Sequence, residues 1–288
     1  MEENEAMLSN YEFNLSDFAL FLSVMKNPRA YRNVLSIFLE EPDIELTEVK
    51  VEQVVLNKSG KRAIRLDAWA KSTDDRRFNM EMQNDTSKDD VRKRSRYYQG
   101  LLDSPILKSG KETRYKYLPS TVIIFITQDD IFGMDRAQYT FSEQCEEIAG
   151  LKLDDGTKKI FFNLTSKNGS QELISLLQYM KRTDIQNPDI TVKDERILEL
   201  DDIVQEVKAS EEWEAVKMSI LEIGIEKGTE IGIQRGLQQG LQQGLQQKLR
   251  EQVEKKLKKG LSVAEIADML EEEESVIVQI VEMINNNK

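Results

Sequence analysis

The 288-residue chain contains no histidine, which excludes Ser-His-Asp and Cys-His catalysis and most zinc hydrolases. Its single cysteine, Cys145, excludes an internal disulfide and a zinc site built from several cysteines, and this usage suits a reducing cytoplasm. The 52 acidic residues outnumber the 40 basic ones and give a net charge of −12, so any contact with nucleic acid requires a local basic region.

Two helices and a strand are predicted at the start of the chain. Apolar spacing predicts a helix over residues 18–25, which the Asn-Pro pair at 27–28 ends. A second helix is predicted over 29–39. A strand over 48–56 and a hairpin turn at 57–60 follow it.

The next stretch predicts a β-hairpin, because both of its halves alternate with period two around a polar turn. Asp67 in the first half and Glu81 in the second then share one face, with the amide of Gln83 beside them. Adjacent carboxylates repel each other, and a hard divalent cation such as Mg²⁺ is a neighbour that both favour. A solvated strand face whose acids pair with flanking arginines has the same spacing, and the spacing alone does not decide between the two. Those arginines are Arg65 and Arg77.

A basic helix is predicted directly after the hairpin, over residues 89–103. From Lys88 to Lys116 the chain holds nine basic residues and four acidic ones, the reverse of its overall balance. A phosphate backbone can lie along such a region, although an ordinary solvated helix has a similar composition. Adjacent tyrosines at 97 and 98 are more typical of a helix core and rim than of nucleophiles. The candidate DNA-binding residues are Arg92, Lys93, Arg94, Arg96 and Tyr98.

Further strands and helices complete an α/β pattern. The continuous apolar run at 121–127 is typical of a strand covered on both faces, and residues 138–141 and 159–164 predict two more extended segments. Helices are predicted over 173–180 and 194–214, the second strongly acidic. Helices followed by mixed strands and helices predict an α/β sandwich around a central sheet.

The composition changes after residue 215. Six glycines recur every four residues from Gly224 to Gly244, and leucines follow the same period from Leu237. Each interior glycine costs a helix about 1 kcal/mol relative to alanine, whereas small residues at this spacing allow helices to approach closely. The segment is therefore either an association helix or a low-complexity linker. Residues 260–288 resemble half of a helix-turn-helix, but they are acidic and lack a third helix, which favours a helical hairpin for association.

Several stretches together resemble one known family. They are the hairpin at 64–83, Arg94-Ser-Arg-Tyr-Tyr-Gln-Gly100, Tyr117-Leu-Pro, 122–126 with the following Phe132-Gly133, and 154–163. From residue 15 to 215 the chain resembles the PD-(D/E)xK nucleases, in the bacterial branch of recombination-promoting nucleases and transposases. The resemblance implies a restriction-endonuclease-like core, with a central mixed sheet flanked by helices, and a helical C-terminal tail. We expect a nuclease-like domain at 1–215, a Gly/Gln-rich helix or linker at 216–259 and a helical hairpin at 260–288.

The resemblance also implies a metal site. Asp67, Glu81 and the main-chain carbonyl of Met82 would hold Mg²⁺ or Mn²⁺, and Asp67, Glu81 and Gln83 would form the catalytic set. Leu66 stands in place of the motif's proline. Gln83 stands in place of its lysine and can neither act as a base nor carry a charge.

Many nucleases of this superfamily carry one more acidic ligand on the helix predicted here at 29–39. Ser36 occupies the expected place, with Glu40 and Glu41 one turn later, which leaves the fourth ligand open.

The implied function is metal-dependent hydrolysis of double-stranded DNA, of the recombination-promoting type. The alternative is a catalytically weak protein of the same fold that binds DNA or a partner and assembles through its tail. No second catalytic acid in an RNase-H-like arrangement supports strand transfer. No run approaches the roughly 20 apolar residues that a membrane helix needs, so we expect no membrane partner. We expect a cytoplasmic protein that forms a homo-oligomer through its C-terminal tail.

Overall fold

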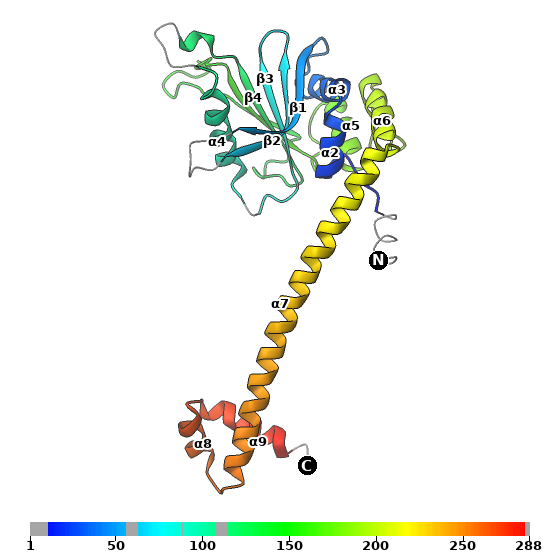
Figure 1. The fold of residues 1–288 in the computed structure, drawn as a ribbon. Helices are drawn as coiled ribbons and strands as arrows, with labels where there is room; N and C mark the ends of the chain where they lie inside the picture. Colours follow the sequence, from blue (N-terminus) through cyan, green and yellow to red (C-terminus); the bar gives the residue numbers. More distant parts are fainter. Residues whose placement is uncertain (1–10, 56–62, 88, 108–113, 286–288) are drawn as a thin grey trace. The chain divides into compact units, whose positions relative to one another are not determined.

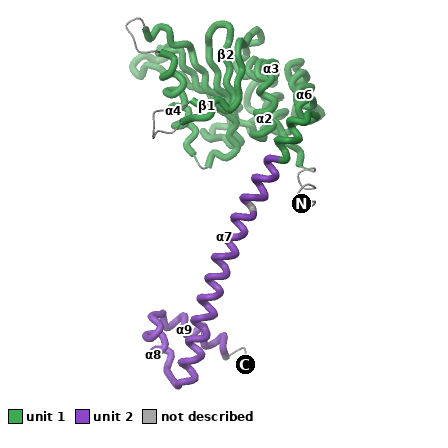
Figure 2. The backbone as a smooth tube through the Cα atoms, viewed as in Figure 1, with its two compact units in different colours: residues 1–218 green, residues 219–288 purple. Residues whose placement is uncertain are grey.

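A six-stranded mixed sheet forms the centre of the first part of the chain (Figure 1). The computed structural model describes residues 11–55, 63–87, 89–107 and 114–285. The chain divides into two compact units, residues 1–218 and 219–288 (Figure 2). The sheet lies in the first unit and has the order β1-β2-β3-β4-β6-β5. Its strands are β1 (Leu46–Val55), β2 (Ile64–Ser72), β3 (Arg77–Gln83), β4 (Thr121–Thr127), β5 (Gln138–Phe141) and β6 (Thr157–Asn163).

The sheet is antiparallel at both edges and parallel in the middle. β2 pairs antiparallel with β1 and β3, while β4 is parallel to both β3 and β6. β5 pairs antiparallel with β6. The predicted hairpin is present as β2 and β3, and β4 is buried along its whole length, as its apolar run predicts. The turn predicted at 57–60 lies outside the described residues.

Helices cover both faces of this sheet (Figure 1). α4 (Val91–Asp103) lies on one face. Its first turn is capped by Asp90, whose carboxylate accepts hydrogen bonds from the main-chain N–H groups of Arg92 and Lys93. The opposite face carries α2 (Phe18–Met25), α3 (Pro28–Phe38) and α5 (Gln171–Lys181), and α6 (Glu195–Lys208) packs against α3 and α2. This arrangement confirms the predicted α/β fold.

The single acidic helix predicted over 194–214 is wrong in one respect. The structure ends α6 at Lys208 and begins α7 (Glu211–Leu257) three residues later. Ser210 causes the interruption, because its Oγ accepts a hydrogen bond from the Trp213 main-chain N–H at 3.1 Å and so caps α7. Trp213 itself is buried and packs edge-on against Phe13, with the ring centroids 5.1 Å apart.

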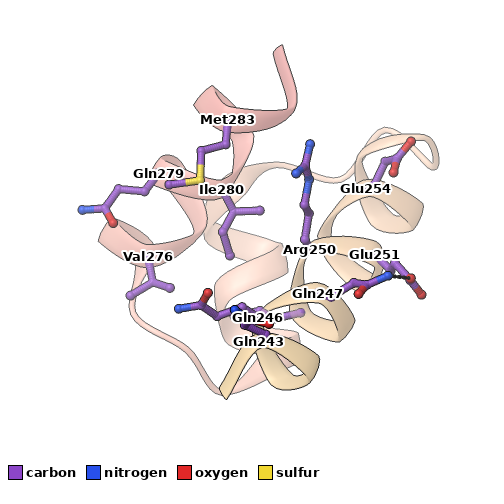
Figure 3. A pocket seen from close by; sticks show the side chains of 11 residues that line it. Gln243, Gln246, Gln247, Arg250, Glu251, Glu254, Val276, Gln279, Ile280 and Met283 are labelled. Carbon is purple, nitrogen blue, oxygen red and sulfur yellow. Dashed lines mark hydrogen bonds between the residues drawn. The ribbon is translucent and has the colours of Figure 1, made fainter. Parts of the chain in front are cut away.

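The regular secondary structure among the described residues of the second unit is all helical. The glycine repeat lies within α7, and two short helices follow it, α8 (Val263–Leu270) and α9 (Glu274–Asn285). Side chains of α7 and α9 line a hollow of about 710 Å³, among them Gln243, Gln246 and Arg250 from α7 and Val276 and Ile280 from α9 (Figure 3). None of the helices among the described residues is long and apolar enough to cross a membrane. A small core holds this unit together: Val253, Ile266, Ala267, Ile277 and Ile284.

Candidate active site

The two candidate carboxylates lie side by side on neighbouring strands. The antiparallel register that pairs Ala68 with Met80 places Asp67 on β2 opposite Glu81 on β3. The main-chain N–H of Asp67 donates to Glu81 Oε1 at 3.0 Å, and the main-chain N–H of Met82 donates to Asp67 Oδ2 at 3.1 Å. Each carboxylate is therefore oriented by the backbone of the other strand.

Burial raises the pKa of both carboxyl groups. Glu81 is 1% exposed, and its burial, together with the negative charge of Asp67, raises its pKa. Burial likewise raises the pKa of Asp67, while the hydrogen bond from Met82 and the charge of Arg94 oppose that rise. Two neighbouring carboxylates that water scarcely reaches favour a cation between them, because it offsets both burial and repulsion.

The donor set suits a hard divalent ion. Asp67 Oδ1 accepts no hydrogen bond from the described residues, so one carboxylate oxygen is available as a ligand. Within the same residues, no three Asp, Glu or Cys side chains gather as a metal site. Two carboxylates and a main-chain carbonyl such as that of Met82 nevertheless match the way Mg²⁺ is usually held, by one or two carboxylates completed with water.

Arg94 reaches this pair from α4. Its Nη2 donates to Glu81 Oε2 at 3.0 Å and its Nη1 donates to Gln83 Oε1 at 2.8 Å. The hydroxyl of Tyr98 accepts from Nε at 2.9 Å and from Nη2 at 2.6 Å. Gln83 Nε2 in turn donates to the carbonyl of Asp85 at 2.5 Å. The structure thus brings Asp67, Glu81, Gln83, Arg94 and Tyr98 together.

The other candidate DNA-binding residues lie elsewhere on α4. Arg92, Lys93 and Arg96 are exposed, and the first two form ion pairs with Asp90 at 3.3 and 3.5 Å. Lys93 also lines a cavity of about 460 Å³ beside Asp67. The polar and charged side chains around this cavity are Arg65, Asp67, Asp89, Lys93, Arg94, Tyr97 and Tyr98. Its cations and its position next to the carboxylates suit a phosphate group.

Ser36 and Glu41 have partners outside this site. Ser36 Oγ donates to the carbonyl of Asn33 at 2.9 Å and accepts from Arg196 at 3.3 Å. The carboxylate of Glu41 is paired with Arg76 at 2.7 Å. Neither side chain is held at Asp67 and Glu81.

Two residues that the sequence did not single out belong to the site. Asn79 is fully buried, and its Nδ2 donates to Glu81 Oε1 at 3.0 Å, while its Oδ1 has no partner among the described residues. Asn79 lies two residues before Glu81, so period-two alternation places both side chains on the same face of the strand. This spacing is the signal from which the sequence could have predicted the contact. Glu52 lies opposite Asp67 in the β1–β2 register with a φ of 51°, a strained conformation for this residue type. Hydrophobic patterning carries no signal for a positive φ.

A family model described as PD-(D/E)XK nuclease family transposase matches residues 17–222, more than half of the chain. No curated protein and no solved structure matches the chain. The match covers every strand of the sheet and the helix that carries Arg94. The chain therefore belongs to the PD-(D/E)XK nuclease family transposases.

Proposed function

We propose that this chain is a metal-dependent endonuclease that hydrolyses phosphodiester bonds in double-stranded DNA. The observation that carries the proposal is the buried pair of Asp67 and Glu81, each oriented by the main chain of the other's strand. Membership of a nuclease family supports the same chemistry. The family's description as transposases supports a role in DNA recombination. We propose the cytoplasm as the compartment of the protein.

In this proposal Asp67, Glu81 and the Met82 carbonyl hold Mg²⁺ or Mn²⁺, since both ions favour carboxylate and carbonyl oxygens. The ion, when bound, lowers the pKa of a water molecule and neutralises charge on the scissile phosphate. The protein supplies the orientation. Main-chain N–H groups fix the two carboxylates, and the hydrogen bonds of Gln83 to Arg94 and Asp85 hold its amide beside them.

Cleavage of supercoiled plasmid by the purified full chain tests this proposal. We expect nicked and linear products with Mg²⁺, none with a chelator, and none from an Asp67→Ala variant. The competing interpretation, a protein that binds DNA without cutting it, predicts DNA binding with no magnesium-dependent product. That result would refute the endonuclease.

The exposed basic residues of α4 are proposed to contact the DNA backbone. Replacing Arg92, Lys93 and Arg96 with serine should weaken binding to all DNA sequences alike. Each lost phosphate contact should reduce the slope of log affinity against log salt by about 0.9, because fewer counterions are released. Fluorescence anisotropy at several salt concentrations measures both effects.

A matched control removes the same charge from the opposite face of the sheet. Lys26, Arg29 and Arg32 are basic residues at or near α2 and α3, with side chains at least 46% exposed. Their replacement with serine should leave the salt slope unchanged. Equal slopes in both triple variants would show that α4 is only a solvated surface.

We propose that a second copy of this chain packs on α7. Leu237, Leu241 and Leu245 are 59–75% exposed there, an apolar stripe that water disfavours. The glycines between them have open space beside them, which permits close approach of another helix. A second copy offers the same spacing, so the two stripes are complementary. In this proposal residues 1–215 cleave DNA, while 216–259 and the hairpin at 260–288 serve association.

Deleting residues 221–288 should therefore lower the number of chains per particle. The truncation keeps the whole first compact unit, including the buried Trp213, so the nuclease-like part should stay folded. Light scattering gives the particle mass, and circular dichroism checks the fold.

A full-length variant separates the apolar stripe from the rest of the tail. Replacing Leu237, Leu241 and Leu245 with glutamine should also lower the particle mass, whereas replacing Gln238 and Gln242 with alanine should not. Unchanged masses in the truncated and leucine variants would leave α7 without a role in association.

A further inference from the structure

The guanidinium of Arg94 is the most closely held cation near the candidate site. Its side chain is 24% exposed, compared with 62% for Arg92 on the same helix. It lies over the rings of Tyr98 and Phe125, at 4.9 and 5.8 Å from their centroids. Ring stacking and the hydrogen bonds to Glu81 and Gln83 together fix its orientation.

Helical spacing explains why Arg94 alone among these arginines turns inward. Val91, Ser95, Tyr98 and Leu102 form the buried stripe of α4, at intervals of three and four residues. Arg94 lies three residues after Val91 and four before Tyr98, so it shares the face that meets the sheet. Arg92 and Arg96 fall on the solvent side.

The hydrogen bonds of this guanidinium leave one donor for a ligand. An arginine carries five N–H groups. Four of them reach Glu81, Gln83 and, twice, the hydroxyl of Tyr98. The second N–H of Nη1 has no hydrogen-bond partner among the described residues, and Arg94 also lines the cavity beside Asp67. The same group therefore touches both the carboxylate pair and the space where a phosphate fits.

We infer that Arg94 contacts the scissile phosphate and supplies the positive charge of the active site, because Gln83 on β3 carries no charge. The inference rests on the proposed endonuclease. Two ionised carboxylates, one guanidinium, one divalent ion and one phosphodiester sum to zero charge. Without Arg94 the same assembly is negative before hydrolysis adds further negative charge to the phosphate. A positioned cation stabilises that added charge more in the transition state than in the ground state.

Arg94→Gln tests the inference, because glutamine keeps hydrogen-bond donors and removes the charge. Single-turnover cleavage at saturating DNA and Mg²⁺ should slow about 10²–10³-fold, the scale for one positioned group. DNA affinity should change far less. The matched control is Arg196→Gln. Arg196 is similarly buried, at 29% exposed, and ion-paired with Asp194, so its loss should affect stability and not the rate.

A second substitution returns the charge from the neighbouring strand. Gln83 directly contacts Arg94, so Gln83→Lys in the Arg94→Gln background places an ammonium where the guanidinium was. We expect this double variant to recover at least tenfold of the lost rate. A folded double variant without recovery, or an Arg94→Gln variant within twofold of the wild-type rate, overturns the inference. If Arg94→Gln does not fold, Arg94→Lys decides, and a loss of more than 10³-fold in it refutes a charge role.

Ion binding separates this inference from the endonuclease proposal. Titration of the metal-free protein with Mn²⁺ should show tighter binding in Arg94→Gln, since the competing cation is gone, and wild-type affinity after Gln83→Lys is added. These shifts with no cleavage by the wild type would refute the endonuclease and uphold Arg94 as the charge of the site. Cleavage by the wild type without these shifts would uphold the endonuclease and refute Arg94 as the charge of the site.

Discussion

The Asp67→Asn variant is expected to lose magnesium-dependent DNA cleavage by several orders of magnitude while it keeps the wild-type fold. Asparagine preserves the shape of the side chain and an oxygen for the Met82 N–H, which donates to Oδ2 in the wild type. It removes one of the two ligand charges, so the divalent ion should bind poorly. Plasmid nicking measured against Mg²⁺ concentration checks this. Full activity with an unaltered magnesium response would rule out the site at Asp67 and Glu81.

The stability of the same variant should move in the opposite direction. Burial raises the pKa of Asp67 to about 6, so the fold penalises its ionised form. This penalty is absent below the ordinary carboxyl pKa, grows as the pH rises, and is complete above the raised pKa. Without metal, Asp67→Asn should melt above the wild type at alkaline pH. The difference should shrink as the pH falls toward about 4, the ordinary carboxyl range. Added Mg²⁺ should raise the melting temperature of the wild type and leave that of the variant unchanged.

The Gln83→Ala variant is expected to cleave DNA about 10²–10³-fold more slowly, the scale for losing one positioned hydrogen-bonding group. Both carboxylates remain, so metal binding should persist. What is lost is the acceptor for Arg94 Nη1 and the donor to the Asp85 carbonyl, which together hold this part of the site. Single-turnover rates at saturating Mg²⁺, with the metal affinity measured separately, distinguish slower chemistry from weaker binding.

Gln138→Ala provides the control for that measurement. Like Gln83, Gln138 lies on a strand, but on β5 and outside the site. Its side-chain amide donates a hydrogen bond to Thr140 at 2.9 Å. Its rate should match the wild type. If Gln83→Ala also matches the wild type, Gln83 has no part in the reaction.

Local pattern was sufficient to predict the carboxylate pair. Period-two alternation in both halves of the hairpin places Asp67 and Glu81 on one face, and the short turn between them allows antiparallel pairing only. The apolar run of β4 likewise predicts a strand that is covered on both faces. These features depend on neighbours in the chain, so a sequence expresses them directly.

Arg94 illustrates what local pattern leaves open. Its charge groups it with Arg92, Lys93 and Arg96 as a candidate DNA contact, and its proximity to Tyr98 is visible in the helical spacing. Nothing in that spacing says that this face of α4 lies over Glu81. The packing of α4 on the sheet, through Val91, Tyr98 and Leu102, decides it.

The sequence by itself therefore determined the α/β pattern, the hairpin, the pair of Asp67 and Glu81 and the resemblance to a nuclease family, since each rests on periodicity or on motif residues. Only the tertiary structure decided that Arg94 meets Glu81 and Gln83, that Asn79 supports Glu81, and that Ser36 and Glu41 turn to other partners. The physical reason is that these contacts join separate elements or depend on a single side-chain orientation. Burial and packing fix such contacts after the elements have formed.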